Sequence, residues 1–196
     1  NTGLIPEISE SAWIAGPSYN IPYKVVNESA DWRGFDVEHE KQKDPLETMS
    51  CVTFSLLNNI EIQHKFNGID INLADKFTAK ISGTTNKGNT FERVADSCRL
   101  SSQGSIGAVF EDVWPNKPKA QTWEEYYKTI PQDVLQKAFK IDFNYEFVPR
   151  STEWAETLRY NLKQCPLWIT WPAQQYHAMT LLYVYPDNIY CDVKDH

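Results

Sequence analysis

Apolar residues between Cys51 and Phe66 are spread around all sides of the helix that this segment would form. Such a distribution predicts a helix buried on every side rather than one with a polar, solvent-facing stripe. Ser50 stands immediately before the segment and is a residue type favoured at the N-cap. The predicted helix therefore carries Cys51 in its first turn. Its apolar positions are Val52, Phe54, Leu56, Leu57, Ile60 and Ile62.

A second helix is predicted after the turn-like stretch "SGTTNKGN", with Asn89 or Thr90 as its cap. The apolar residues of this segment fall at i, i+3, i+4 and i+7, which is one helical face. Cys98 is the last of them, so we interpret its thiol as part of the core. The four positions are Phe91, Val94, Ala95 and Cys98.

The pattern changes in the second half of the chain. Residues 141–148 alternate apolar and polar, which predicts a half-buried strand, and a helix is predicted from Ser151 to about Gln164. Three strand-like runs follow, "PLWITW", "HAMTLLYVY" and "NIYCDV", the last two joined as a hairpin by the turn "PDN". The chain therefore predicts an α+β protein of two lobes sharing a cleft. We divide it into an extended lead-in (1–30), a mainly helical lobe (31–118) and a mainly β lobe (119–196).

The composition narrows the function classes. The chain has 196 residues, of which 41% are hydrophobic, with a net charge of −7 and scattered basic residues. This suits one domain, predicts no nucleic-acid surface, and contains no apolar run long enough for a membrane span. The four cysteines form no CxxC pair, so we expect reduced thiols and no zinc ribbon. The chain begins at Asn1 without a signal-peptide pattern, and we expect it to be part of a larger polypeptide or assembly.

Cys51 has two interpretations, a buried structural thiol or a nucleophile. The N–H groups and the dipole of a helix N-terminus stabilise a thiolate, which would lower the thiol pKa from about 8.5. A nucleophile also needs a base. His64 lies 13 residues further along the same helix, about 20 Å away, and His39 lies in a charged stretch. His196 is the last residue, whereas His177 begins an apolar strand.

The hairpin provides a partner for that histidine. If residues 186–188 form the turn, Tyr185 pairs with Ile189, and paired residue numbers sum to 374. Asp195 then lies diagonal to His177 on the same face of the sheet, within side-chain reach. A carboxylate there holds the imidazole in the tautomer that a base requires. A slip of one residue in this register would reverse the choice of partner.

The order of these features resembles the papain-like cysteine peptidases. The resemblance runs from about Asp31 to the end, through "DWR", "SCVTFS", "TNKGNTFERVADSCRL", "CPLWITW", "HAMTLLYVY" and "CDVKD". His177 follows Cys51 by 126 residues and Asp195 follows it by 144, close to the family's spacing of Cys, His and Asn. The family's fold is a two-lobed α+β domain with the active-site cleft between the lobes.

The chain departs from the family pattern around the nucleophile. The family's oxyanion glutamine lies six residues before the cysteine, where this chain has Pro45. Gln42 lies nine residues before, and a three-residue loop insertion would reconcile the two positions. Asp195 stands where the family has Asn. The family's Cys, Gly and Trp are replaced by Thr48, Met49 and Val52.

The resemblance implies peptide-bond hydrolysis without a metal or cofactor. Cys51 and His177 would form a thiolate–imidazolium pair, and Cys51 would attack a peptide carbonyl to give an acyl-enzyme. The backbone N–H of Cys51 and the side chain of Gln42 would hold the oxyanion. His177, oriented by Asp195, would move the proton. Gly88 would let the backbone of a protein or peptide substrate approach closely. Two alternatives remain open: a peptidoglycan amidase or transpeptidase with the same chemistry, and an inactive papain-like binding or assembly module.

Overall fold

A computed structural model describes residues 24–38, 40–148, 152–171, 177–187 and 190–195. Residues 1–23, which make up most of the predicted lead-in, lie outside this description. The three strands form one antiparallel sheet in the order β1-β2-β3, which confirms the predicted α+β class. The elements are η2 (Arg33–Phe35), α1 (Cys51–Phe66), α2 (Asp75–Ile81), α3 (Phe91–Cys98), α4 (Trp123–Tyr126), α5 (Gln132–Leu135), α6 (Trp154–Leu162), β1 (Leu167–Trp171), β2 (His177–Val184) and β3 (Cys191–Lys194).

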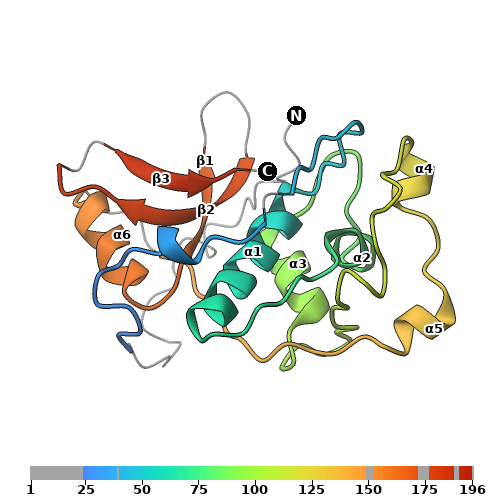
Figure 1. Cartoon of the computed structure of the whole chain (residues 1–196), viewed down its shortest axis with the longest axis horizontal. Helices are drawn as coiled ribbons and strands as arrows, with labels where there is room; N and C mark the ends of the chain where they lie inside the picture. The colour runs from blue at the N-terminus through green and yellow to red at the C-terminus, as the bar shows by residue number, and fades with distance from the viewer. Residues whose placement is uncertain (1–23, 39, 149–151, 172–176, 188–189, 196) are drawn as a thin grey trace.

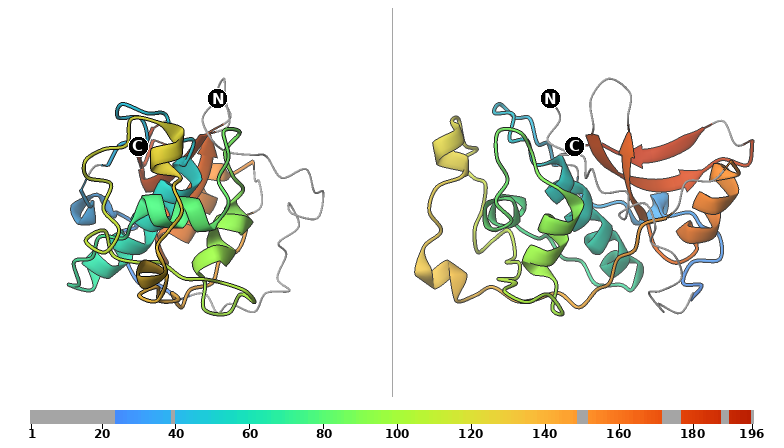
Figure 2. Two further views of the ribbon diagram at one scale, coloured as in Figure 1. Left: turned by 90° about the vertical axis from the view of Figure 1, so that its right-hand side faces the viewer. Right: turned by 180° about the vertical axis from the view of Figure 1, so that it is seen from behind.

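The predicted buried helix is confirmed as α1, which begins at Cys51 and runs between the sheet on one side and α2 and α3 on the other (Figures 1 and 2). Its two sides are therefore both covered, which explains why its sequence has no polar stripe. Ser50 occupies the N-cap position, but its hydroxyl makes no capping bond. Instead Ser50 Oγ lies 2.5 Å from Thr48 Oγ1, so the expected side-chain cap is absent at this helix start.

The second predicted helix is confirmed as α3. Thr90 is its N-cap, and the Thr90 hydroxyl accepts a hydrogen bond of 3.3 Å from the N–H of Arg93. Val94, Ala95 and Cys98 of the apolar face are buried as their spacing predicted, and Phe91 is partly buried against the same core.

The sheet register agrees with the prediction at Thr180 and Leu181 and differs nearer the turn. Thr180 pairs with Lys194, so the paired numbers sum to 374 as predicted. Between Leu181 and Tyr183 an irregularity shifts the register, and Tyr183 pairs with Asp192, a sum of 375. The predicted partner of Tyr185, residue 189, lies outside the described residues. A bulge inserts one unpaired residue, so one register does not hold along the whole hairpin.

The predicted strand at 141–148 is wrong. Ile141 makes one parallel bridge to Arg99, and the residues after it form no ladder. The apolar members of the alternation instead pack on the core cluster around α1, which gives period-two burial without a strand. The helix predicted from 151 is confirmed over the shorter range of α6. The pattern gave no prediction for α2, which is only seven residues long.

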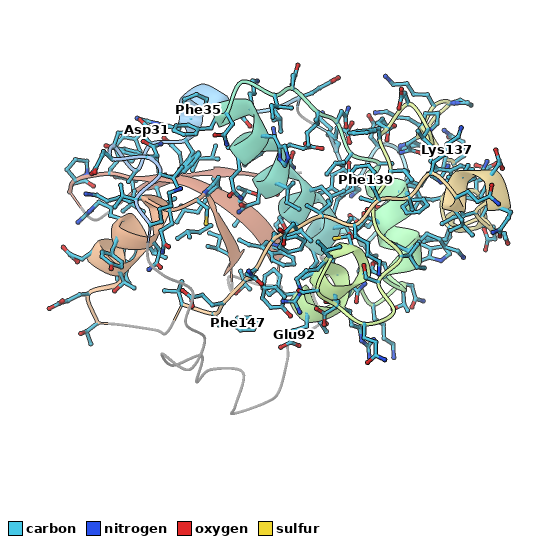
Figure 3. All side chains as sticks on the ribbon, turned by 90° about the horizontal axis from the view of Figure 1, so that it is seen from below. Asp31, Phe35, Glu92, Lys137, Phe139 and Phe147 are labelled. Carbon is cyan, nitrogen blue, oxygen red and sulfur yellow. The ribbon has the colours of Figure 1, made fainter. Side chains whose placement is uncertain are left out.

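The core places the start of α1 where helices and sheet meet. One cluster joins Cys51, Val52 and Leu56 to α3 and to Ala178 of β2. A second joins Ile62, further along α1, to α6 and to the sheet. A third lies around α2 and α5, away from the sheet. In Figure 3, Asp31 and Lys137 mark the two opposite sides of α1.

Candidate active site

Cys51 is fully buried at the first residue of α1. Burial raises the pKa of its thiol to about 12, more than the main-chain groups of Ala178 and Val52 lower it. The carboxylates of Glu47 and Asp195 raise it further. The expected lowering of this pKa is therefore wrong for the resting chain, because loss of hydration outweighs the helix terminus. The resting thiol is protonated.

His177 and Asp195 lie together as the diagonal register predicted. His177 Nε2 lies 2.5 Å from Asp195 Oδ1, although β3 ends one residue before the aspartate. The side chain of His177 is 16% exposed and that of Asp195 is 65% exposed. The carboxylate thus reaches the imidazole from the solvent side, while the ring itself is mostly covered.

The other ring nitrogen of His177 has an unusual setting. Nδ1 is buried and has no hydrogen-bond partner among the described residues. In the neutral imidazole one nitrogen donates and the other accepts, and a carboxylate at Nε2 requires the proton to be on Nε2. Nδ1 then carries an unprotonated lone pair. A buried polar atom without a partner costs about 1–3 kcal/mol, so its presence in a well-packed chain calls for an explanation.

The fold brings Cys51 to the strand that carries this histidine. The thiol lies against the main chain of Ala178, which directly follows His177. Ala178 and Cys51 also belong to the same buried cluster. Thr180 strengthens this junction, because its hydroxyl donates to the carbonyl of Ser55 in α1 at 2.9 Å. A regular helix start and a regular strand start therefore meet at the candidate site.

Gln42 is buried beside the segment that leads into α1. Its side-chain Nε2 donates to Glu47 Oε1 at 3.0 Å. Its main-chain carbonyl accepts from the N–H of Thr48 at 3.2 Å and from the hydroxyl of Thr48 at 2.9 Å. Lys43 and Glu47 form an isolated antiparallel β-bridge, so residues 42–48 make a closed turn. The turn ties a glutamine nine residues before the cysteine to the start of α1. Its oxyanion role stays a prediction.

Gly88 lies in a tight turn with φ of +95°, a conformation that favours glycine. Its N–H donates to the carbonyl of Thr85 at 2.8 Å, and the N–H of Thr85 donates to its carbonyl at 3.2 Å. These bonds explain a glycine at this position through turn geometry. Contact with a substrate stays a prediction.

Among the described residues, the remaining thiols and the remaining histidine form no second site. All four cysteines are free, and burial raises the pKa of Cys98 to about 12 and that of Cys165 to about 11. His64 lies in the last turn of α1, where Nδ1 is 2.9 Å from the carbonyl of Ile60. His39 and His196 lie outside the described residues. Within the described ranges, no cluster of three or more acidic, His or Cys side chains is arranged to hold a metal ion.

Glu47 is the residue at this site that sequence reasoning missed. Its Oε1 accepts both from Gln42 and from the N–H of Met49, each at 3.0 Å. Met49 has φ of +57°, which a non-glycine residue rarely adopts. A single glutamate in an irregular turn has no periodic signal. The available signal was Met49, because it stands where the resembled family has glycine.

Comparison with known proteins supports the fold. No family model matches the sequence, and no curated protein matches it. Among solved structures, the chain is similar to the proform of Amb a 11, a cysteine protease and major ragweed pollen allergen. The TM-score is 0.54 and the identity 17%, over 87% of this chain. The match spans 53% of that protein, about half its length. At this identity the likeness shows a shared fold, that of a cysteine protease.

No helix within the described ranges is long and apolar enough to cross a membrane.

Proposed function

We propose that the chain is a papain-like cysteine endopeptidase with Cys51 as nucleophile and His177 as base. The observation that carries the proposal is the buried Nδ1 of His177. The other ring nitrogen, Nε2, is hydrogen-bonded to Asp195. A base must present an unprotonated nitrogen, and this ring presents one next to the strand residue that contacts the thiol. The shared fold with a cysteine protease supports the same assignment.

The chemistry would begin from a neutral thiol, because burial disfavours the thiolate. As the Cys51 sulfur attacks the peptide carbonyl, its proton passes to His177 Nδ1, giving an imidazolium that Asp195 stabilises through Nε2. The imidazolium then protonates the leaving amine, and the acyl-enzyme forms. In the second half, Nδ1 takes a proton from water as the hydroxide adds to the acyl carbon. The C–S bond then breaks, the carboxylic acid leaves, and the imidazolium returns its proton to the Cys51 sulfur.

Two features would complete the site. The N–H of Cys51 and the side-chain amide of Gln42 would hold the developing oxyanion. The mainly helical and mainly β parts of the chain would form the walls of a cleft above the start of α1, and the turn at Gly88 would approach the peptide main chain. The substrate would be an extended protein or peptide segment.

A second candidate function is an inactive papain-like module that binds a partner. The observation that favours it is the complete burial of Cys51, whose thiol pKa of about 12 leaves almost no thiolate at neutral pH. In that case the site retains the family's geometry without its reactivity.

The two functions separate in a turnover assay with a peptide library, read by mass spectrometry. The peptidase proposal expects cleavage that is lost in Cys51→Ala. Cys98→Ala is the matched control, since it also removes a fully buried thiol from a helix. Cleavage retained in Cys51→Ala, or no cleavage by a folded parent chain, would reject the peptidase and favour the binding module.

A further inference from the structure

Glu47 occupies an unusual position for a carboxylate, four residues before the candidate nucleophile. One of its oxygens accepts two hydrogen bonds of 3.0 Å, from the amide of Gln42 and from the N–H of Met49. It thereby joins the two residues on which the geometry before α1 depends. The aspartate beside His177 contacts the candidate base, whereas this glutamate lies in the turn that leads into α1.

The bond to Gln42 fixes a direction. An amide nitrogen carries two N–H groups in a rigid plane, so holding one of them by a carboxylate sets where the other points. Charge-assisted bonds of this kind are about twice as strong as neutral ones. The main chain of Gln42 is also held, through two bonds from Thr48. Both ends of the glutamine are therefore tied to the turn that leads to Cys51.

The bond to Met49 stabilises a conformation that the residue would otherwise avoid. A side chain at φ of +57° costs free energy that the surroundings must offset. Glu47 supplies an acceptor to the N–H of this residue. Further along the turn, the hydroxyl of Tyr127 donates to the carbonyl of Thr48 at 2.6 Å, so the turn is held from two sides.

We propose that Glu47 is a positioning residue that orients the Gln42 amide and the Met49 main chain, and so sets the geometry at the start of α1. Its effect on turnover rests on the proposed peptidase function, whereas its effects on Gln42 and on the thiol do not. The charge of Glu47 also disfavours the Cys51 thiolate. Asp195 also disfavours this thiolate, and the thiol in turn acts electrostatically on the hydroxyl of Tyr127.

Two variants and a control separate positioning from charge. Glu47→Gln keeps an acceptor oxygen and removes the charge, while Glu47→Ala removes both. Glu28→Gln is the control, since it removes the same charge from a side chain that is 82% exposed and lies beside Lys163. Thermal unfolding of each variant establishes that it is folded.

The first readouts need no catalysis. In Glu47→Ala the side-chain amide signals of Gln42 in ¹⁵N NMR move toward those of a solvated amide, and in Glu47→Gln they stay close to the parent's. Alkylation of Cys51 at about pH 8.5 becomes about threefold faster in Glu47→Gln, because loss of a nearby negative charge favours the thiolate. These results with a catalytically silent parent chain would support the positioning role and reject the peptidase.

The last readout is turnover. In an active parent, Glu47→Ala lowers kcat about a hundred-fold with little change in KM, because a misdirected donor weakens only the transition state, and Glu47→Gln restores most of the loss. The proposal is overturned if Glu47→Ala and Glu47→Gln match Glu28→Gln in the Gln42 signals and in Cys51 alkylation. With an active parent, equal kcat in all three variants would also overturn it.

Discussion

The two sides of the candidate site are built differently. On the sheet side, His177 and Asp195 are set by strand pairing, and a register sum of 374 places them 2.5 Å apart. On the loop side, Gln42 and Glu47 are set by hydrogen bonds within a closed turn that follows no regular element. Regular pairing is encoded in the period of the sequence, whereas the turn depends on a few individual side chains. The loop side should therefore tolerate substitution less well than its irregular sequence suggests.

The largest effect is expected from removing the proposed catalytic base, which lies on the sheet side. His177→Ala removes the nitrogen that takes the thiol proton, and we expect a loss of about a thousand-fold in kcat/KM. Peptide turnover measures it, with His64→Ala as the control from the far end of α1. Equal loss in both variants would mean that His177 has no special part.

A smaller effect should come from the orienting carboxylate. Asp195→Ala frees the imidazole to rotate, and a misplaced base costs about a hundred-fold in kcat. Asp195→Asn keeps an acceptor oxygen without the charge, so its loss should be about ten-fold. A kcat series of the parent, Asn and Ala variants measures the order. An Ala variant as active as the parent would contradict the role of this contact.

The third test uses pH. Glu40, just before the turn at residues 42–48, contacts a buried carboxyl, so this side of the site should respond to pH. Glu40 hydrogen-bonds Asp75, and burial raises the pKa of Asp75. Burial also raises the pKa of Glu61 to about 8 and that of Glu111 to about 7. These three carboxyls therefore bind more protons in the folded chain than in the unfolded chain above about pH 4.5. The stability that these raised carboxyls contribute is fully present below about pH 4.5 and is lost as the pH rises toward about 8.

We expect the Tm to fall on the order of 5 °C between about pH 5 and about pH 8. Glu61→Gln should flatten this dependence, since it removes the charge and keeps an acceptor for the N–H of Leu73, a bond of 2.7 Å. Differential scanning calorimetry measures both, with exposed Glu124→Gln as the charge-matched control. A Tm that rises over this range would contradict the assignment.

The smallest effect is expected from removing one hydrogen bond that holds the loop side. Tyr127→Phe removes the bond to the carbonyl of Thr48 and should cost about 1 kcal/mol, or about 3 °C in Tm. Tyr190→Phe, from a residue that is 65% exposed, should leave the Tm unchanged. Equal melting of the two variants would show that the turn does not depend on this bond.

The sequence predicted the sheet side well because its signals are periodic. Thr180 and Leu181 pair with β3 as the hairpin count required. The count failed at Tyr183 and Val184, past the bulge, which period-two reasoning does not detect. The alternation at 141–148 was misleading, because burial of alternate side chains on a core does not require a strand partner.

The loop side and the thiol pKa could not be predicted for a different reason. The bond from Gln42 to Glu47 joins polar side chains in an irregular turn, for which spacing gives no rule. The helix start correctly suggested a favourable dipole for Cys51. How much hydration the thiol loses depends on the strand that packs over it, and that packing is a tertiary property.

The most direct test of the account is the rate at which a peptidyl electrophile labels each cysteine, read by peptide mass spectrometry. The account predicts a covalent adduct on Cys51 alone, formed at a rate that falls sharply in His177→Ala and is unchanged in His64→Ala. An adduct rate on Cys51 that is the same in all three chains, or no adduct on Cys51 in the folded parent, would contradict a cysteine nucleophile served by this histidine.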